Sequence, residues 1–369
     1  MKRILTFTIC FCICSFAAHS QEFDYNAGFG YHFDNAEYSQ SHNLFQPSGT
    51  VHLANFYAEG GFSFDSGRNM KHKVLAGFDV AKNMGEQSDD NLDKELLLSY
   101  QMDVKTLWGS FSAVFGCFPR TFSEGEYCDA LFGRDIYYTD RNFEGVFLKY
   151  REKGFYSEIG LDWMGMYGPD RRERFQIMSA GKWKMSDWLW FGWDASMYHF
   201  AGSEVHRNVV DNMMVHPYLQ VSPDVSIQKF SLSAGWIQKY DRDRSVEGSA
   251  SFHGGALINL GLKNWNVGVE NDFYFGQDLM PLFAGSNNGV KYGTDLYFGN
   301  RFYHTQIEGF SIYDRAEIYY EPSITSWLDF RVSAIFNVGN PTQEFSFFRG
   351  WQQMLSLRVN LEKIRTISK

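Results

Sequence analysis

The sequence lacks long hydrophobic runs. Beyond its first 20 residues, no stretch of the 369-residue chain is apolar for the length of a membrane-spanning helix. An excess of basic residues is missing too, because 34 Lys and Arg stand against 43 Asp and Glu, a formal net charge of −9. The first absence excludes a bundle of membrane helices, and the second argues against nucleic acid as a partner.

Proline and cysteine are also scarce, with eight and five residues respectively, whereas aromatic residues make up 18% of the chain and glycines number 34. In an exported chain, abundant aromatics and glycine without hydrophobic runs point to β-structure. The question is then whether this chain forms a soluble sandwich or a membrane barrel.

Export is indicated by the N-terminus. The chain starts with the basic MKR, continues with fourteen mostly apolar residues, and reaches AHS, which has small residues where a signal peptidase reads. We therefore expect residues 1–20 to be a signal peptide and residues 21–369 to be one exported domain. Lipoprotein processing is the alternative, but bulky residues precede both Cys12 and Cys14.

Two cysteines, Cys117 and Cys128, lie outside this leader. Both belong to one acidic segment, CFPRTFSEGEYCDALFGRDIYYTD, and an exported protein meets an oxidising compartment. We predict a disulfide between them, with two free thiols as the alternative.

Alternation at period two dominates the rest of the chain. In residues 95–104, one face carries Leu96, Leu98, Tyr100, Met102 and Val104. The other face carries Glu95, Ser99, Gln101 and Asp103. A soluble sandwich would show Lys, Glu and Thr on its polar face, whereas these polar faces mix Gly, Ser, Asn, Tyr and scattered charges. That mixture suits a wet lumen, and the tryptophans of WLWFGW suit a membrane interface.

Short and long connections alternate along the chain. Seven short ones are predicted at 65–69, 104–105, 151–154, 184–187, 222–224, 262–265 and 321–326. Eight longer ones are predicted at about 34–49, 83–93, 118–141, 167–172, 201–208, 241–247, 277–311 and 339–350. Because lipid offers the backbone no hydrogen-bond partner, the sheet has to close. The predicted fold class is all-β, a transmembrane antiparallel up-and-down β-barrel of about 16 strands. The alternatives are 14 strands, or 18 if the alternating VKYGTDLYFG adds a pair.

The leader, the alternating strands, the aromatic girdles and the alternating loop lengths resemble porin-like outer-membrane β-barrels with sixteen strands. FPR, which precedes the acids of this segment, and WQQ before the last strand are similar to outer-membrane proteins of Bacteroidetes-type bacteria. The resemblance implies the outer membrane of a Gram-negative bacterium, contact with outer-membrane lipid, and an assembly that could be a homotrimer. The chain departs from many such barrels by ending in IRTISK rather than on an aromatic residue.

The acidic segment is the third long loop, between strands expected at 105–118 and 142–151. The resemblance implies that this loop folds into the lumen and narrows it, with its acids facing basic residues on the wall. The predicted pore constriction comprises Arg120, Glu124, Glu126, Asp129, Arg134 and Asp135. An ordinary solvated surface loop is the alternative.

Charged residues on polar strand faces form the predicted lumen wall. They include Arg315, Glu317, Asp329, Arg331, Arg358, Asp162 and Asp194. Opposite charges across a lumen create a transverse field that favours polar solutes. Because acids outnumber bases on the polar faces, cations or neutral solutes are favoured. A structural lattice of salt bridges is the alternative, and it is compatible with a pore.

No cofactor, metal or catalytic site is predicted. The histidines are scattered without ligand spacing, and Ser251 with His253 lacks the third partner of a hydrolase. We therefore expect a porin, not an enzyme, that passes small polar solutes such as sugars or ions by passive diffusion. One alternative is a non-conducting barrel that binds or assembles surface proteins, with residues 118–141 and 277–311 plugging the lumen. A less favoured alternative is an outer-membrane lipid hydrolase.

Overall fold

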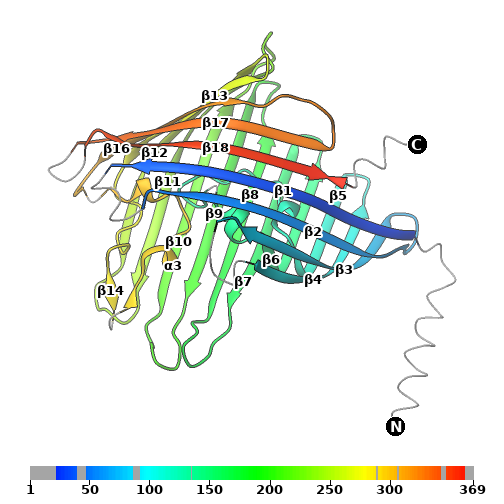
Figure 1. Ribbon diagram of the computed structural model, residues 1–369, viewed down its shortest axis with the longest axis horizontal. Helices are drawn as coiled ribbons and strands as arrows, with labels where there is room; N and C mark the ends of the chain where they lie inside the picture. The colour runs from blue at the N-terminus through cyan, green and yellow to red at the C-terminus, as the bar shows by residue number, and fades with distance from the viewer. Residues whose placement is uncertain are drawn as a thin grey trace.

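The chain folds into a closed β-barrel (Figure 1). The computed structural model describes residues 22–39, 47–85, 92–133, 135–287, 290–305, 307–341 and 346–361. Within these ranges, sixteen strands each pair antiparallel with two neighbours and form one continuous sheet. The prediction of an all-β, antiparallel barrel of about 16 strands is confirmed.

The elements have the following bounds. The barrel strands are β1 (Glu22–Tyr38), β2 (Gly49–Asp65), β3 (Met70–Asn83), β4 (Leu92–Lys105), β5 (Gly109–Pro119), β6 (Asn142–Glu152), β7 (Phe155–Gly165), β8 (Arg174–Lys184), β9 (Leu189–Phe200), β10 (Val210–Val221), β11 (Lys229–Asp243), β12 (Ser251–Asn264), β13 (Val267–Gly276), β16 (Ser311–Tyr320), β17 (Leu328–Gly339) and β18 (Phe348–Asn360). Elements within loops are η3 (Arg120–Phe122), α2 (Ile136–Thr139), β14 (Ser286–Asn287), β15 (Val290–Lys291), α3 (Gly293–Leu296) and η4 (Arg301–Tyr303).

The barrel closes between its first and last strands. Gly28 of β1 lies opposite Asn360 of β18, and the pairing continues along the two strands, which run side by side in Figure 1. β13 pairs directly with β16, so the chain between them leaves the wall. β14 and β15 pair with each other in a separate two-stranded sheet. The alternative of 18 barrel strands is therefore wrong for the described residues.

The alternation places apolar side chains outside and polar ones inside. On β4, Leu96 and Leu98 are 74% and 56% exposed. On β7, Ile159 is 46% exposed, whereas Glu158 and Asp162 on the other face are 1% and 2% exposed. Successive side chains of a strand point to opposite faces, so each strand presents apolar side chains to the outside and polar side chains to the interior of the barrel.

The two ends of the barrel differ in the length of their connections. Short turns, which include the two-residue turn between β12 and β13, gather at the end where β1 begins and β18 ends. Trp265 and Asn266 make that turn with φ of 50° and 65°, the left-handed pair that suits a tight hairpin. We call this end the short-turn end and the opposite one the long-loop end. Exposed Trp108, Trp188 and Trp265 stand in or beside the short turns.

Two of the long loops position the candidate site. Residues 120–141, between β5 and β6, are called the third loop, and residues 277–310, between β13 and β16, the seventh loop. Among helices in the described ranges, none is both long and apolar enough to cross a membrane. The expected signal peptide and the C-terminal IRTISK lie outside the described residues, so both stay predictions.

Candidate functional site

The third loop folds into the barrel, as the resemblance to porin-like barrels implies. Leu131 and Phe132 are each 5% exposed, although they sit in a loop. They join one buried apolar cluster with Val210 and Met214 from the wall strand β10. A solvated surface loop would leave these side chains in water, so the structure does not follow that alternative.

Glu158 on β7 is the main wall contact of the third loop. Its carboxylate accepts the backbone N–H groups of Glu124 and Gly125, each at 3.0 Å. It also accepts the hydroxyls of Ser123 at 2.6 Å and Tyr127 at 2.8 Å. A buried carboxylate that accepts several donors is a strong, charge-assisted anchor. The alternation places Glu158 on the lumen face, but nothing in the local sequence marks the loop as its partner.

Arg120 ties the start of the third loop to its end and to the wall. Its Nη2 lies 2.7 Å from carboxylate oxygens of both Asp140 and Asp162. Its Nε donates to the carbonyl of Asp140 at 2.6 Å, and its guanidinium stacks 4.2 Å from the centre of the Phe143 ring. Arg120 therefore pairs at the base of the loop, where both of its ends meet.

Two acids of the predicted constriction lie at the tip of the third loop. They pair with basic wall residues to which the sequence gave no role. Glu124 pairs with Lys149 at 2.8 Å and with Arg151, both on β6, and Glu126 pairs with Lys182 on β8 at 2.5 Å. Partial burial works to raise the pKa of Glu124, but the hydrogen bonds and charges of Lys149 and Arg151 outweigh it and hold that pKa below its usual value.

The predicted basic wall residue that meets the loop is Arg315. Its side chain is 2% exposed, and its Nη2 lies 2.7 Å from Glu317 while its Nε lies 3.5 Å from Asp129 of the third loop. Arg331 on β17 continues the row, 2.7 Å from Glu317 and 3.0 Å from Glu270. Basic and acidic side chains therefore alternate across β13, β16 and β17. This arrangement agrees both with a pore and with a structural lattice of salt bridges.

The seventh loop also folds inward. Leu279, Met280 and Leu296 have exposed fractions of 0%. Wall side chains bond its backbone: the Tyr198 hydroxyl donates to the carbonyl of Asp295 and the Asn212 amide to that of Leu296, each at 3.0 Å. The sequence left open whether this loop acts as a lid, dips inward or, in the non-conducting alternative, plugs the lumen.

The two loops meet inside the barrel. The N–H of Gly133 donates to the carbonyl of Phe298 at 2.7 Å, and the N–H of Asn300 donates to the carbonyl of Asp129 at 2.7 Å. Leu131 and Phe132 share the buried apolar cluster with Leu296. Together the loops fill part of the barrel's cross-section with an apolar core.

Cavities remain between this core and the side of the wall formed by β1, β16, β17 and β18. The first, about 340 Å³, reaches Pro47 at the long-loop end and is lined by Asp34, Asp135 and Arg301. The second, about 380 Å³, lies between the third loop and β16–β18. Asp129 and Met354 line both cavities, so we call this pair the neck.

A third cavity, about 560 Å³, reaches the turn between β16 and β17 at the short-turn end. Predicted wall residues Asp329 and Arg358 line it. It shares Tyr137, Tyr138 and Arg331 with the second cavity. The three cavities therefore adjoin in series from one end of the barrel to the other.

The predicted site residues fall in four different places. The cavity series is lined by Glu126, Asp129, Asp135, Arg315, Glu317, Asp329, Arg331 and Arg358. The third loop is held against the wall by Arg120, Glu124 and Asp162, while Asp194 contacts Cys128 on the far side. Arg134 lies outside the described residues. Met354 and Arg301 were missed, because a methionine on a strand and an arginine in a loop carry no distinctive pattern.

The predicted disulfide is not formed, because Cys117 and Cys128 are both free. Cys117 lies on β5 opposite Glu144 of β6, whereas the loop carries Cys128 to Asp194 on β9. Closeness in sequence suggested a bond, but the inward course of the loop separates the two thiols.

Ser251 and His253 contact backbone carbonyls. The Ser251 hydroxyl donates to the carbonyl of Asp241 at 3.4 Å, and His253 Nδ1 lies 2.6 Å from the carbonyl oxygen of Asp278. These contacts give the lipid-hydrolase alternative no support. That the chain is not an enzyme stays a prediction.

No family model and no curated protein sequence matches this chain. Among solved structures, outer-membrane expressed OmpT of Vibrio cholerae is 10% identical with a TM-score of 0.53, over 93% of this chain and 98% of that one. OccK2 (OpdF) of Pseudomonas aeruginosa is 10% identical with a TM-score of 0.50, over 92% of this chain and 98% of that one. A trimer form of in-vitro folded OmpT has a TM-score of 0.50 at 10% identity, over 92% of this chain and 99% of that one. At such identity the likeness shows the fold alone.

Proposed function

We propose that the protein is an outer-membrane porin of a Gram-negative bacterium that passes small polar solutes, such as sugars or ions, by passive diffusion. The observation that carries the proposal is the series of three adjoining cavities between the long-loop end and the short-turn end. Apolar side chains outside and polar ones inside suit lipid around the barrel and water within it. The fold likeness to an outer-membrane protein agrees with that location.

Charges of both signs along the series support polar solutes. In the first cavity, Asp34, Asp129 and Asp135 face Arg301 and Arg315. In the second, Glu126, Asp129 and Glu317 accompany Arg331. Charges of opposite sign across a narrow passage orient dipolar solutes, and the excess of acids favours cations or neutral molecules over anions.

A non-conducting barrel that binds or assembles surface proteins is the second candidate. Its supporting observation is the apolar core that the third and seventh loops share inside the barrel. Such a core would serve as a plug if the neck is too narrow for a hydrated solute.

Single-channel recording in planar bilayers separates the two candidates. The purified protein should give steps of stable conductance, and proteoliposome swelling should then rank sugars and ions. A folded barrel that stays silent in the bilayer would overturn the porin proposal and favour the plugged one.

A matched pair of variants tests the route. Met354→Trp narrows the neck and should lower the conductance, because Met354 lines both adjoining cavities. Gln353→Trp alters the next residue, whose exposed side chain is on the outer face, and should leave conductance unchanged. Equal conductance in the two variants would place the passage elsewhere in the barrel.

A homotrimer and a Bacteroidetes-type source are further parts of the proposal. The trimer draws support from OmpT of Vibrio cholerae, which is solved in a trimer form. Native mass spectrometry in detergent should then give three chains per particle, and a monomer would contradict the trimer alone.

A further inference from the structure

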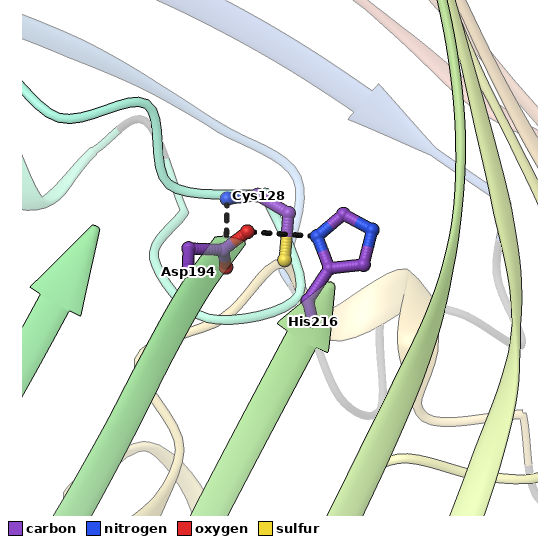
Figure 2. A group of neighbouring side chains, drawn as sticks. All are labelled: Cys128, Asp194 and His216. Atoms are coloured by element: carbon purple, nitrogen blue, oxygen red, sulfur yellow. Dashed lines mark hydrogen bonds and ion pairs between the residues drawn. The ribbon is translucent and has the colours of Figure 1, made fainter. Parts of the chain in front are cut away.

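The third loop carries Cys128 across the barrel to a pair of buried wall residues. Asp194 on β9 and His216 on β10 lie directly opposite each other in the strand register. Figure 2 shows the cysteine side chain of the loop above these two strands. Its Sγ, a carboxylate oxygen of Asp194 and a ring nitrogen of His216 all lie within 4.8 Å of one another. None of the three residues belongs to the neck or to the anchors described above.

Asp194 is the shared partner of the other two residues. One carboxylate oxygen lies 2.7 Å from His216 Nδ1, and the other accepts the N–H of Cys128 at 3.4 Å. Asp194 and His216 are 1% and 3% exposed. The three side chains are therefore held in one orientation, which lowers the entropy cost of binding a ligand between them.

His216 has unused bonding capacity. Its Nε2 is buried and has no hydrogen-bond partner among the described residues. A buried polar atom without a partner is unfavourable, so such atoms are rare unless water, an ion or a function accounts for them. Beside Nε2 stands Gly235 of β11, where a Cβ would come within 2.6 Å of the nitrogen. Nε2 therefore faces β11, whereas Nδ1 faces Asp194 and is the nitrogen that would bind an ion held with Cys128 and Asp194 (Figure 2).

A thiol, a carboxylate and an imidazole make a donor set for zinc. Zn²⁺ binds Cys sulfur, His nitrogen and Asp oxygen, and sites with three protein ligands keep a fourth position for water or a solute. A cavity of about 200 Å³ borders all three residues and could supply that position. It is also lined by Glu126, Asp129 and Asp272, whose charges draw cations toward it.

We propose that Cys128, Asp194 and His216 form a Zn²⁺ site that clasps the tip of the third loop to strands β9 and β10. The sequence did not reveal it, because its ligands are 66 and 22 residues apart along the chain. The site is independent of conduction, since it requires the folded loop and not an open passage.

A second group provides an internal comparison. Glu95, Cys117 and Glu144 also place one ligand atom each within 4.8 Å of the others. That group has two carboxylates and no imidazole, and Glu144 is exposed. Hard carboxylate oxygens suit zinc less well than a buried set with nitrogen and sulfur. We therefore assign the zinc to Cys128.

The test uses the purified, folded full chain after treatment with a chelator. Calorimetric titration with Zn²⁺ should give one ion per chain, and titration with Co²⁺ should give the near-ultraviolet charge-transfer band of a thiolate ligand. If the unmodified protein binds no Zn²⁺ and Co²⁺ gives no such band, the proposal is overturned whatever the variants do, and the three residues are then only a hydrogen-bonded contact.

Variants assign the ion to its ligands. Cys128→Ser should abolish the band and weaken Zn²⁺ binding by roughly a hundredfold, because one of three ligands is lost. His216→Asn can keep a donor for Asp194 while removing the imidazole, and should weaken binding similarly. Cys117→Ser is the matched control and should leave both readouts unchanged. Loss of the band in Cys117→Ser, or its survival in Cys128→Ser, would contradict the assignment.

Discussion

The third loop and the seventh loop fill the same barrel, but different interactions hold them. Beyond the apolar cluster that both loops share, the third loop is bound to the wall by charge, through Arg120 to Asp162 and through the donors that Glu158 accepts. The seventh loop is held mainly by apolar burial, as at Leu296, and by hydroxyl and amide hydrogen bonds, two of which run from its tyrosines to wall carboxylates. A charge pair fixes the orientation of its side chains, and its stability depends on pH and on both partners. The stability gained from apolar burial depends instead on how completely the buried volume is filled.

The largest effect is expected from Arg120→Met. The change leaves the carboxylate of Asp162 buried without its cation, which typically costs about 3–5 kcal/mol. Urea unfolding of the detergent-folded protein should show the loss, and hydrogen exchange should show the base of the third loop opening.

Arg151→Met is the matched control for that prediction. Arg151 also contacts the third loop, at Glu124, but its side chain is 56% exposed, so we expect less than about 1 kcal/mol. Equal losses in the two variants would mean that burial does not decide how charge holds this loop.

What the sequence predicts about the two loops follows from the range of their interactions. Strand alternation is local, so Glu95 and Leu96 could be assigned to opposite faces from neighbouring residues alone. The strand count then predicts that the third loop joins the fifth and sixth strands, and its acids make it a candidate site. Its base, however, depends on Asp162 and its tip on Glu158, and no local pattern pairs those residues with the loop.

The seventh loop was harder to predict because apolar burial has no signature in a loop. Between Leu279 and Leu296, apolar residues such as Met280 and Phe283 are mixed with polar and small ones, and the alternation of VKYGTDLYFG pointed to a strand pair instead of a buried loop. Their partners lie on distant strands, as with Asn212 and Leu296, which are 84 residues apart. The proposed zinc ligands were missed, and a disulfide was favoured over its free-thiol alternative, for the same reason, since only the folded loop brings Cys128 to Asp194.

Leu296→Ala tests the seventh loop by volume instead of charge. Leu296 has no exposed surface and shares its cluster with Leu131 and Phe132 of the third loop, so the cavity should cost about 2–4 kcal/mol. Urea unfolding measures the loss, and hydrogen exchange should rise in both loops. Leu282→Ala, at a partly buried position of the same loop, should cost less. Faster exchange confined to the seventh loop would mean that the shared core does not couple the two.

Glu158→Gln keeps the shape of the main anchor and removes its charge. Hydrogen bonds to an ionised acceptor are about twice as strong as neutral ones, so we expect a loss of about 1–2 kcal/mol. Exchange of the N–H groups of Glu124 and Gly125 should accelerate while the seventh loop stays protected. Asp187→Asn removes a carboxylate that is 99% exposed on a short turn, and should change neither readout. Slower or unchanged exchange at Glu124 in Glu158→Gln would show that charge is not what holds the loop.

The smallest effect is expected from the pH dependence of the Glu124 contact. Lys149 and Arg151 hold the pKa of Glu124 below its usual value of 4.5, despite the opposing effect of burial. A lowered pKa in the folded loop means that the contact stabilises the loop above pH 4.5 and loses this contribution as pH falls through the lowered pKa. The carboxylate is 46% exposed, so solvent screening keeps the effect below about 1 kcal/mol. Exchange at the loop tip should therefore rise modestly on acidification, and Lys149→Met should reduce that rise. The seventh loop has acidic partners of its own, since Tyr297 and Tyr292 donate to the carboxylates of Asp241 and Asp243, so its exchange should also respond to acid. Lys149→Met should leave that response unchanged; a matching change in both loops would contradict a separate role for the Glu124 contact.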